Sequence, residues 1–157
     1  MRRKGFIRRR PHHPFVVTTP AWPSIVFLTV CTKNRKSILA TSQAHAVLIE
    51  AWTRADAWLV GRYVLMPDHV HLFCVPGDGE LPLAPWVHYW KSHSSQRWPE
   101  PAARPVWQTD FWETQLRRGE SYDAKWEYVR ANPVRAGLLV HPEAWPYAGE
   151  LNTLSWP

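Results

Sequence analysis

Apolar and β-branched residues gather in three short stretches of the first half of the chain, and each stretch predicts a strand. Residues 25–31 are almost continuously apolar, as in a buried strand. Residues 63–66 and 69–75 predict a second and a third strand, and Pro67-Asp68 between them favours a tight turn. We therefore expect the second and third strands to pair antiparallel.

Apolar residues at helical spacing predict three helices. They cover about residues 41–58, 83–98 and 121–132, and the third ends there because Pro133 disfavours helix in the residue before it. One further turn is expected before Gly137, since glycine commonly closes a helix in the left-handed conformation.

The order of these elements predicts the fold class. Two strands follow the first helix directly, and residues 106–108 and 111–113 indicate a further short strand or extended pair before the third helix. Such an order is typical of an α+β domain. We predict an antiparallel sheet with helices packed on one face.

The net charge of +6 comes from one end of the chain. Six of the 19 Lys and Arg residues lie in the first ten positions, which contain no acidic residue, and the remaining 13 equal the 13 Asp and Glu. We therefore divide the chain into a basic arm over 1–23, one domain over 24–150 and a short tail over 151–157. The arm is expected either to attract a polyanion such as nucleic acid or to act as a solubilising tail.

Export and membrane insertion are not expected from this sequence. The basic start runs into Pro-His-His-Pro at 11–14 instead of the apolar segment of a signal peptide, and no apolar run approaches membrane-spanning length. Cys31 and Cys74 fall in predicted buried strands, where cysteine behaves as a small apolar residue. We predict a cytoplasmic protein without a membrane partner.

Two histidines stand two residues apart in the third predicted strand. Side chains alternate between the faces of a strand, so His69 and His71 project from one face, while Val70 and Leu72 point the other way. Paired imidazoles on a rigid strand suit a metal ion, although they could instead make ordinary hydrogen bonds on a solvated face. We favour a metal site, which a third ligand or substrate oxygens must complete. An open site of this kind can polarise a phosphoryl oxygen.

A basic, tyrosine-containing segment leads into the third helix. If the helix starts near Ser121, Tyr122 lies in its first turn, where free backbone N–H groups favour a phenolate or a phosphate. Arg117 and Arg118 could hold phosphate oxygens in bidentate fashion. From local sequence alone, a packed Tyr122 and two solvated arginines are the simpler interpretation.

Other aromatic and basic residues could contact DNA. Trp107 and Trp112 lie shortly before that segment, and bases of single-stranded DNA stack on such rings, although core packing is the simpler role for both. Arg130 and Arg135 could bind phosphates, but no spacing argument selects them.

These residues occur within two motifs of a known family. Met-Pro-Asp-His-Val-His-Leu at 66–72 resembles the histidine–hydrophobe–histidine motif of the single-tyrosine HUH transposases. The stretch 111–138, which includes Glu-Ser-Tyr at 120–122 and Tyr-Val-Arg-Ala-Asn-Pro-Val-Arg-Ala-Gly-Leu at 128–138, is similar to the REP-associated branch of that family. The resemblance covers roughly residues 24–148.

This resemblance implies a ferredoxin-like sheet with the histidine pair on a central strand and the tyrosine on a facing helix. His69 and His71 would bind Mg²⁺ or Mn²⁺, and Tyr122 would attack a phosphate of single-stranded DNA. The products would be a 5′-phosphotyrosine link and a free 3′-hydroxyl, so rejoining would need no ATP. Hairpin or repeat DNA is the expected partner, and the protein is expected to be a monomer or a homodimer.

One position departs from the family's pattern. Related single-tyrosine enzymes carry a polar third ligand one helical turn after the tyrosine, and counting from Tyr122 that position is Trp126, which cannot coordinate a metal. Asp123 and Glu127 are close in sequence but lie well round the helix from Tyr122. Glu127 is retained as a candidate, and the identity of the third ligand stays open.

The sequence therefore predicts a DNA strand transferase with a transposase-like mechanism. Three alternatives stay open at this stage: a relative that binds hairpin DNA without cutting it, a metal-dependent hydrolase that uses water as nucleophile, and a structural domain whose histidines bind no metal. Loss of activity in Tyr122→Phe would separate strand transfer from hydrolysis by water.

Overall fold

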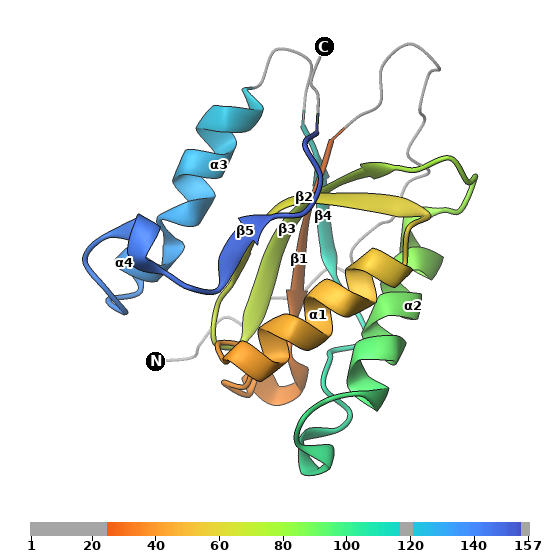
Figure 1. Cartoon of the computed structure of the whole chain (residues 1–157), viewed down its shortest axis with the longest axis horizontal. Coiled ribbons are helices and arrows are strands. Elements are labelled where there is room, and N and C mark those ends of the chain that lie inside the picture. Colours follow the sequence, from red (N-terminus) through yellow and green to blue (C-terminus); the bar gives the residue numbers. More distant parts are fainter. Residues whose placement is uncertain (1–24, 117–120, 155–157) are drawn as a thin grey trace, which may run out of the picture.

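The computed structural model describes residues 25–116 and 121–154, which contain one five-stranded antiparallel sheet and its helices (Figure 1). The strand order is β4-β1-β3-β2-β5, so β3 is the central strand. The strands are β1 (Val26–Cys31), β2 (Trp58–Leu65), β3 (His69–Pro76), β4 (Trp112–Gln115) and β5 (Ala148–Glu150). The helices are α1 (Ser42–Arg54), α2 (Leu83–Gln96), α3 (Tyr122–Arg130) and α4 (Asn132–Arg135), with 3₁₀ turns η1 (Lys33–Arg35), η2 (Pro101–Ala103) and η3 (Pro142–Ala144).

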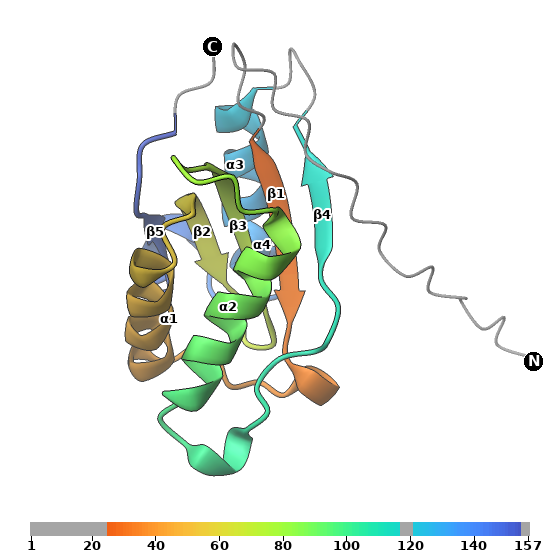
Figure 2. The same ribbon diagram turned by 90° about the vertical axis from the view of Figure 1, so that its right-hand side faces the viewer.

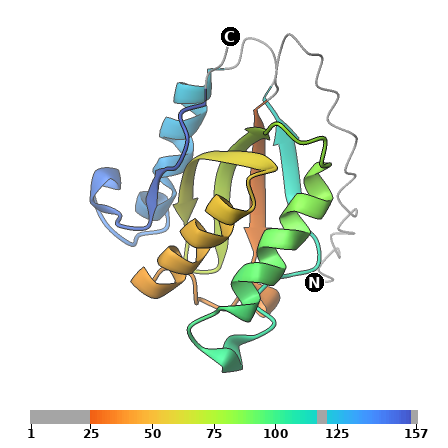
Figure 3. The ribbon, with the colours of Figure 1, turned by 45° about the vertical axis from the view of Figure 1, so that its right-hand side comes forward.

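Helices cover both faces of the sheet. α1 and α2 lie on one face and α3 on the other, as Figures 2 and 3 show from two directions. The α1–α2 side holds the larger apolar core, to which β3 contributes Val70, Leu72 and Cys74. α3 covers a smaller core that contains Phe73. The α+β class and the antiparallel sheet are confirmed, but the expectation that the helices pack on one face is wrong for α3.

The sequence of β3 explains why a helix packs on each face. Its side chains alternate, and apolar residues occur in both sets, so both faces of the strand need cover. Tyr122 and Val129 of α3 are buried against the face of Phe73. His69 and His71 belong to the same alternating set as Phe73, and they therefore lie on the side of α3.

Helix α1 is shorter than its apolar pattern predicts. It begins after Thr41, whose side chain accepts a hydrogen bond from the backbone N–H of Ala44 at 3.1 Å. It ends at Arg54, whereas the prediction extended it to Trp58. Trp58 instead opens β2 and is buried in the larger core, because the chain turns after the helix and enters the sheet.

Strand β2 is longer than predicted and is irregular in its middle. Its register with β3 shifts between Val60 and Tyr63. Gly61 and Arg62 lie at this irregularity and interrupt the apolar run. For this reason the apolar pattern predicts only the second half of β2. A Cβ atom on Gly61 would lie 2.5 Å from Cδ1 of Leu154, so close packing requires glycine there.

Two short edge strands complete the sheet. β4 pairs with β1, and the predicted extended segment before β4 makes a bridge between Trp107, which is buried, and Thr32. β5 pairs with β2 and was not predicted, because three residues carry too little pattern. In the predicted tail, Leu151 and Asn152 donate hydrogen bonds to carbonyls of β2, and Leu154 is buried.

The segment that carries the candidate tyrosine is helical as predicted. Ser121 caps α3 by accepting a hydrogen bond from the N–H of Ala124 at 3.1 Å. α4 follows almost directly, and Gly137 after it has a φ of 74°. The predicted phosphate ligands Arg117 and Arg118 lie outside the described residues, as does the basic arm.

Two further expectations concern the core and the membrane. Cys31 and Cys74 are both buried, and neither forms a disulfide. Of the helices in the part of the chain that the structure describes, none is long and apolar enough to cross a membrane.

Candidate active site

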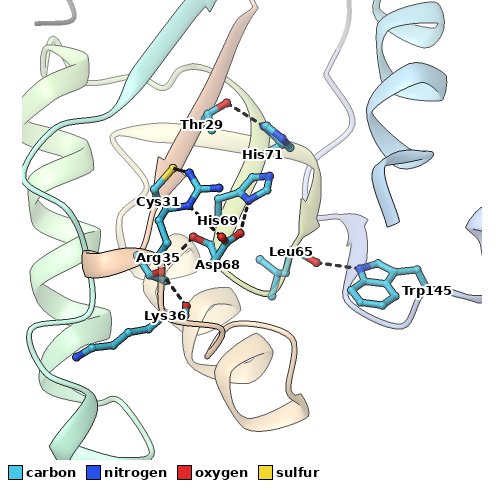
Figure 4. A network of polar contacts seen from close by, with 10 residues as sticks. Thr29, Cys31, Arg35, Lys36, Leu65, Asp68, His69, His71 and Trp145 are labelled. Carbon is cyan, nitrogen blue, oxygen red and sulfur yellow. Dashed lines mark hydrogen bonds and ion pairs between the residues drawn. The ribbon is translucent and has the colours of Figure 1, made fainter. Parts of the chain in front are cut away.

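His69 and His71 project from the same face of β3, as the alternation predicts. Their ring centroids lie 4.7 Å apart, with the ring planes at 81° (Figure 4). In the register of the two strands, Cys31 of β1 pairs with His69 and Thr29 pairs with His71. The two imidazoles are therefore neighbours on a central strand, supported from β1.

A carboxylate holds the Nδ1 atom of His69. This atom lies 2.7 Å from Oδ1 of Asp68. Burial raises the pKa of Asp68, but hydrogen bonds from His69 and Arg35 outweigh that effect and hold the pKa below its ordinary value. The carboxylate is thus ionised at neutral pH and can only accept a hydrogen bond. It follows that Nδ1 of His69 carries the proton and Nε2 keeps a lone pair.

His71 is neutral over the physiological pH range. Its Nδ1 atom lies 2.8 Å from Oγ1 of Thr29. Burial lowers the pKa of His71 to about 3, and repulsion from the neighbouring His69 ring when that ring is protonated acts in the same direction. Arg135 and Arg35 act in the same direction. A neutral imidazole has no proton to lose before it binds a metal ion.

The histidine pair fits a divalent metal ion. Both rings offer nitrogen atoms from one face, and a hydrogen bond at Nδ1 fixes the orientation of each. Two imidazoles favour Mn²⁺ by ligand softness, whereas Mg²⁺ prefers oxygen ligands. Within residues 25–116 and 121–154, no three His, Cys, Asp or Glu side chains are grouped so that they could hold an ion. Among these residues, a third ligand must therefore be of another type, unless the substrate supplies it.

Glu127, the predicted third ligand, is engaged elsewhere. Its Oε1 accepts a hydrogen bond from Nη1 of Arg130 at 3.3 Å, and Arg130 also lies 3.8 Å from Glu143 in η3. The structure does not bring Glu127 to the histidines, because this ion pair holds it on another side of α3. The charge of Arg130, a predicted phosphate ligand, is likewise compensated by two carboxylates.

Tyr122, the predicted nucleophile, is part of the smaller core. It is only 7% exposed, and its hydroxyl accepts a hydrogen bond from the backbone N–H of Arg62 at 3.0 Å. A Cβ atom on Gly61 would lie 2.7 Å from that hydroxyl, so the phenol fills the space left by the glycine. Burial raises the pKa of Tyr122 to about 12. A buried phenol that holds its proton this firmly is a poor nucleophile.

The hydroxyl of Tyr122 is also displaced along the sheet from the histidines. His71 pairs with Val64 of β2, whereas the hydroxyl is bound at Arg62, two residues further along that strand. At about 3.4 Å per residue this separation is roughly 7 Å along the strand. The ring of Phe73 packs against Tyr122, with centroids 4.9 Å apart, on the same face. The structure therefore does not support Tyr122 as the nucleophile.

A second tyrosine of α3 is accessible. Tyr128 is 65% exposed, and the guanidinium of Arg135 lies 4.1 Å from the centroid of its ring. Arg135 is also close enough to His71 to lower the pKa of that histidine. The arginine of α4 thus contacts the Tyr128 ring, and its positive charge acts on His71.

Asn132 follows Tyr128 by four residues, about one helical turn, and opens α4. Its Oδ1 accepts a hydrogen bond from Nη2 of Arg135. An amide oxygen is a suitable ligand for Mg²⁺ or Mn²⁺, and a polar residue is what the family's pattern has one turn after its tyrosine. One turn after Tyr122 stands Trp126, so the pattern shows no polar partner when it is counted from that tyrosine. Counted from Tyr128, the same spacing falls on Asn132.

The face of the histidines continues toward β4. Trp112, which is 43% exposed, pairs there with Thr29, the residue that contacts His71. Phe27 stacks on His71 with ring centroids 5.2 Å apart, and Nζ of Lys125 lies 5.4 Å from the centroid of Phe27. Aromatic rings and a positive charge therefore border the histidines on this side.

Comparison with known proteins identifies the family of this chain, which is a class of proteins that process DNA. Residues 22–131 match the family described as Transposase IS200 like, and the chain belongs to that family. It is 26% identical over 126 residues to the REP-associated tyrosine transposase of Escherichia coli (strain K12). The aligned region covers 78% of this chain and 73% of the relative. The fold is similar to that of a REP-associated tyrosine transposase solved in complex with a REP hairpin. The TM-score is 0.73 at 22% identity, over 89% of this chain and 81% of that chain.

Proposed function

We propose that this protein cuts and rejoins single-stranded DNA through a covalent link to Tyr128. The observation that carries the proposal is the exposed Tyr128 ring with the Arg135 guanidinium over it, on a helix that packs on the face of the sheet from which His69 and His71 project. In the proposed complex, a phosphate bound on this face meets the phenol, the guanidinium and the histidine pair. Because one structurally similar protein is bound to a hairpin, hairpin DNA with a single-stranded flank is the proposed substrate. The proposed location of the protein is the cytoplasm.

The proposed step exchanges one phosphate ester for another. Oη of Tyr128 attacks the phosphorus, the phenolic proton passes to solvent, and the bond between phosphorus and the 3′ oxygen breaks. That oxygen takes up a proton and becomes the free 3′-hydroxyl of the upstream fragment, while the phosphate at the 5′ end of the downstream fragment stays attached to the protein as a phosphotyrosine. Because the new ester keeps the energy of the phosphodiester, a 3′-hydroxyl can later attack it and rejoin a strand without ATP.

Arg135 is the proposed phosphate ligand beside the nucleophile. A guanidinium can bind two phosphate oxygens in parallel, which fixes orientation as well as charge. Its contacts to the Tyr128 ring and to Asn132 hold it where such a phosphate would face the phenol. On the β4 side of the histidines, the exposed ring of Trp112 is the proposed platform for a flanking base.

His69 and His71 would hold a divalent ion, with Asn132 as the candidate third ligand. Bound there, Mn²⁺ or Mg²⁺ supplies a Lewis acid that polarises a phosphoryl oxygen. The chain's own contribution is to keep both imidazoles oriented through Asp68 and Thr29. Tyr122 has a structural role in this scheme, since its hydroxyl satisfies a backbone N–H of the sheet.

The test uses the full chain, Mn²⁺ and a pool of 3′-labelled hairpin oligonucleotides with randomised single-stranded flanks. We expect a labelled protein–DNA species that survives SDS and disappears with EDTA or in Tyr128→Phe. Tyr122→Phe is the matched control, because it removes the same hydroxyl from the same helix. It is expected to keep forming the species while losing about 1–3 kcal/mol of stability, since the N–H of Arg62 is left without its acceptor.

Each alternative gives a different result in the same assay. Loss of the covalent protein–DNA species in Tyr122→Phe alone, with both variants folded, would show that Tyr122 is the nucleophile. Cleavage with no covalent species would indicate a hydrolase that uses water. Hairpin binding that survives EDTA, with neither cleavage nor adduct, would indicate a protein that recognises DNA without cutting it.

A further inference from the structure

Arg35 lies between a thiol and the carboxylate that holds His69. Its Nε donates to Oδ2 of Asp68 at 2.9 Å, and its Nη1 donates to Sγ of Cys31 at 3.0 Å (Figure 4). The other oxygen of Asp68 lies 2.7 Å from Nδ1 of His69. Arginine, carboxylate and imidazole therefore form one continuous chain of polar contacts that ends on a candidate metal ligand.

The backbone that carries Arg35 has an unusual conformation. Asn34 and Arg35 have φ angles of 58° and 54°, although neither is glycine. Two successive residues in the left-handed region are costly and persist only where the surrounding structure fixes them. Strained backbone of this kind is concentrated at functional sites, and here it orients the side chain of Arg35.

Hydrogen bonds attach this strained turn to the connection between β2 and β3. The N–H of Thr32 donates to the carbonyl of Asp68 at 2.9 Å, and the hydroxyl of Thr32 lies 2.8 Å from the carbonyl oxygen of Lys36 and 3.2 Å from that of Asp68. The N–H of Leu39 donates to the carbonyl of Pro67 at 2.9 Å. Thr32 thus fixes the backbone of Asp68, while Arg35 fixes its carboxylate.

We propose that Arg35 is a positioning residue, which holds the Asp68 carboxylate against Nδ1 of His69 and so reserves Nε2 of that ring for the metal ion. Asp68 has two rotatable side-chain bonds and reaches both partners only in one orientation of its carboxylate. Removing the guanidinium frees the carboxylate to turn toward solvent. The proposal rests on the proposed function, in which His69 and His71 form the metal site.

The first test measures the affinity of the metal-free full chain for Mn²⁺ by titration followed by electron paramagnetic resonance. Partners of metal ligands typically change affinity by about 10- to 100-fold when removed, and we expect a loss in that range for Arg35→Ala. Arg35→Lys, which keeps one donor for Asp68, is expected to restore part of the affinity. Arg54→Ala is the matched control and is expected to bind as the wild type, because Arg54 makes a comparable pair with Glu50 on the surface of α1.

The second test needs no metal. Long-range ¹H–¹⁵N NMR of the metal-free protein reports which ring nitrogen of each histidine carries the proton. We expect His69 to be protonated at Nδ1 in the wild type and to become a mixture of both tautomers in Arg35→Ala. Asp68→Asn is examined in the same way, so that a folding defect in one variant does not decide the outcome.

The two measurements separate this inference from the proposed function. Unchanged Mn²⁺ affinity and an unchanged His69 tautomer in folded Arg35→Ala would overturn the role of Arg35, whatever the chemistry of the site. A wild type that shows the expected tautomer but binds no Mn²⁺ would leave the polar chain as proposed and contradict the metal site.

Discussion

The guanidinium of Arg135 lies 4.1 Å from the centroid of the Tyr128 ring, and this contact joins α4 to α3. The same side chain donates to Asn132 and lowers the pKa of His71. A single arginine thus contacts the accessible phenol and a polar residue one turn after it, and its charge acts on a candidate metal ligand. On this basis the proposed site includes the exposed end of α3 and not its buried start.

Arg135→Ala is expected to slow adduct formation by about 10- to 100-fold. A hydrogen bond to a charged group contributes about 1.5–3 kcal/mol, and the guanidinium is the proposed partner of the attacked phosphate. The rate of adduct formation at saturating DNA measures this effect. Arg130→Ala is the control, because its charge is already compensated by Glu127 and Glu143, and it should change the rate little. Equal losses in both variants would mean that Arg135 contributes only general positive charge.

Trp112→Ala is expected to weaken the binding of single-stranded DNA by about 1–3 kcal/mol, the contribution of one stacked base. Trp112→Phe should retain most of the affinity, since it keeps an aromatic face. Fluorescence anisotropy with a labelled oligonucleotide measures the change. Tyr89→Ala removes a ring that is also half exposed but belongs to α2, on the other face of the sheet, and should have no effect. Comparable losses for Trp112 and Tyr89 would rule out a specific platform.

The stability of the metal-free protein is expected to fall as the pH drops below about 6.5, in part because of His71. Its pKa is about 3 in the folded protein against an ordinary value of 6.5, so the unfolded chain takes up the proton first. The contribution is complete above pH 6.5 and is lost progressively toward pH 3, with a slope of up to about 1.4 kcal/mol per pH unit. Chemical denaturation at pH 7 and pH 5 measures it. His71→Asn should show a smaller decrease over this interval, and an identical decrease would exclude His71 as the cause.

Gly61→Ala is expected to destabilise the protein by about 1–3 kcal/mol through overpacking. The added methyl group would lie 2.5 Å from Leu154 and 2.7 Å from the hydroxyl of Tyr122. Gly79→Ala, where no atom lies within 4 Å of the new group, should change the stability by less than about 0.5 kcal/mol. Thermal denaturation compares the two. A neutral Gly61→Ala would mean that Tyr122 does not occupy this place against β2.

The histidine pair was predictable because it depends on backbone geometry alone. Strand alternation places His69 and His71 on one face whatever the strand packs against, and the observed register agrees. The start of the third predicted helix near Ser121 was predictable for a similar reason, since the Ser121 side chain satisfies a backbone donor within its own helix.

The choice between two tyrosines on one helix could not be made from local spacing. Tyr122 and Tyr128 are six residues apart, about 240° round the helix, so one faces the sheet when the other does not. Which of them is buried depends on Phe73 and on the space above Gly61, both set by the tertiary structure. The packing of α3 on the second face of the sheet also depends on tertiary contacts, so local spacing could not predict it.

The most direct measurement is the identity of the peptide that carries the nucleotide. Trypsin cleaves after Lys125 and Arg130, so Tyr128 lies in the peptide 126–130 and Tyr122 in the peptide 119–125. After nuclease and trypsin digestion of the covalent species, mass spectrometry should find the phosphonucleotide on 126–130. A modified 119–125 with an unmodified 126–130 would contradict the account.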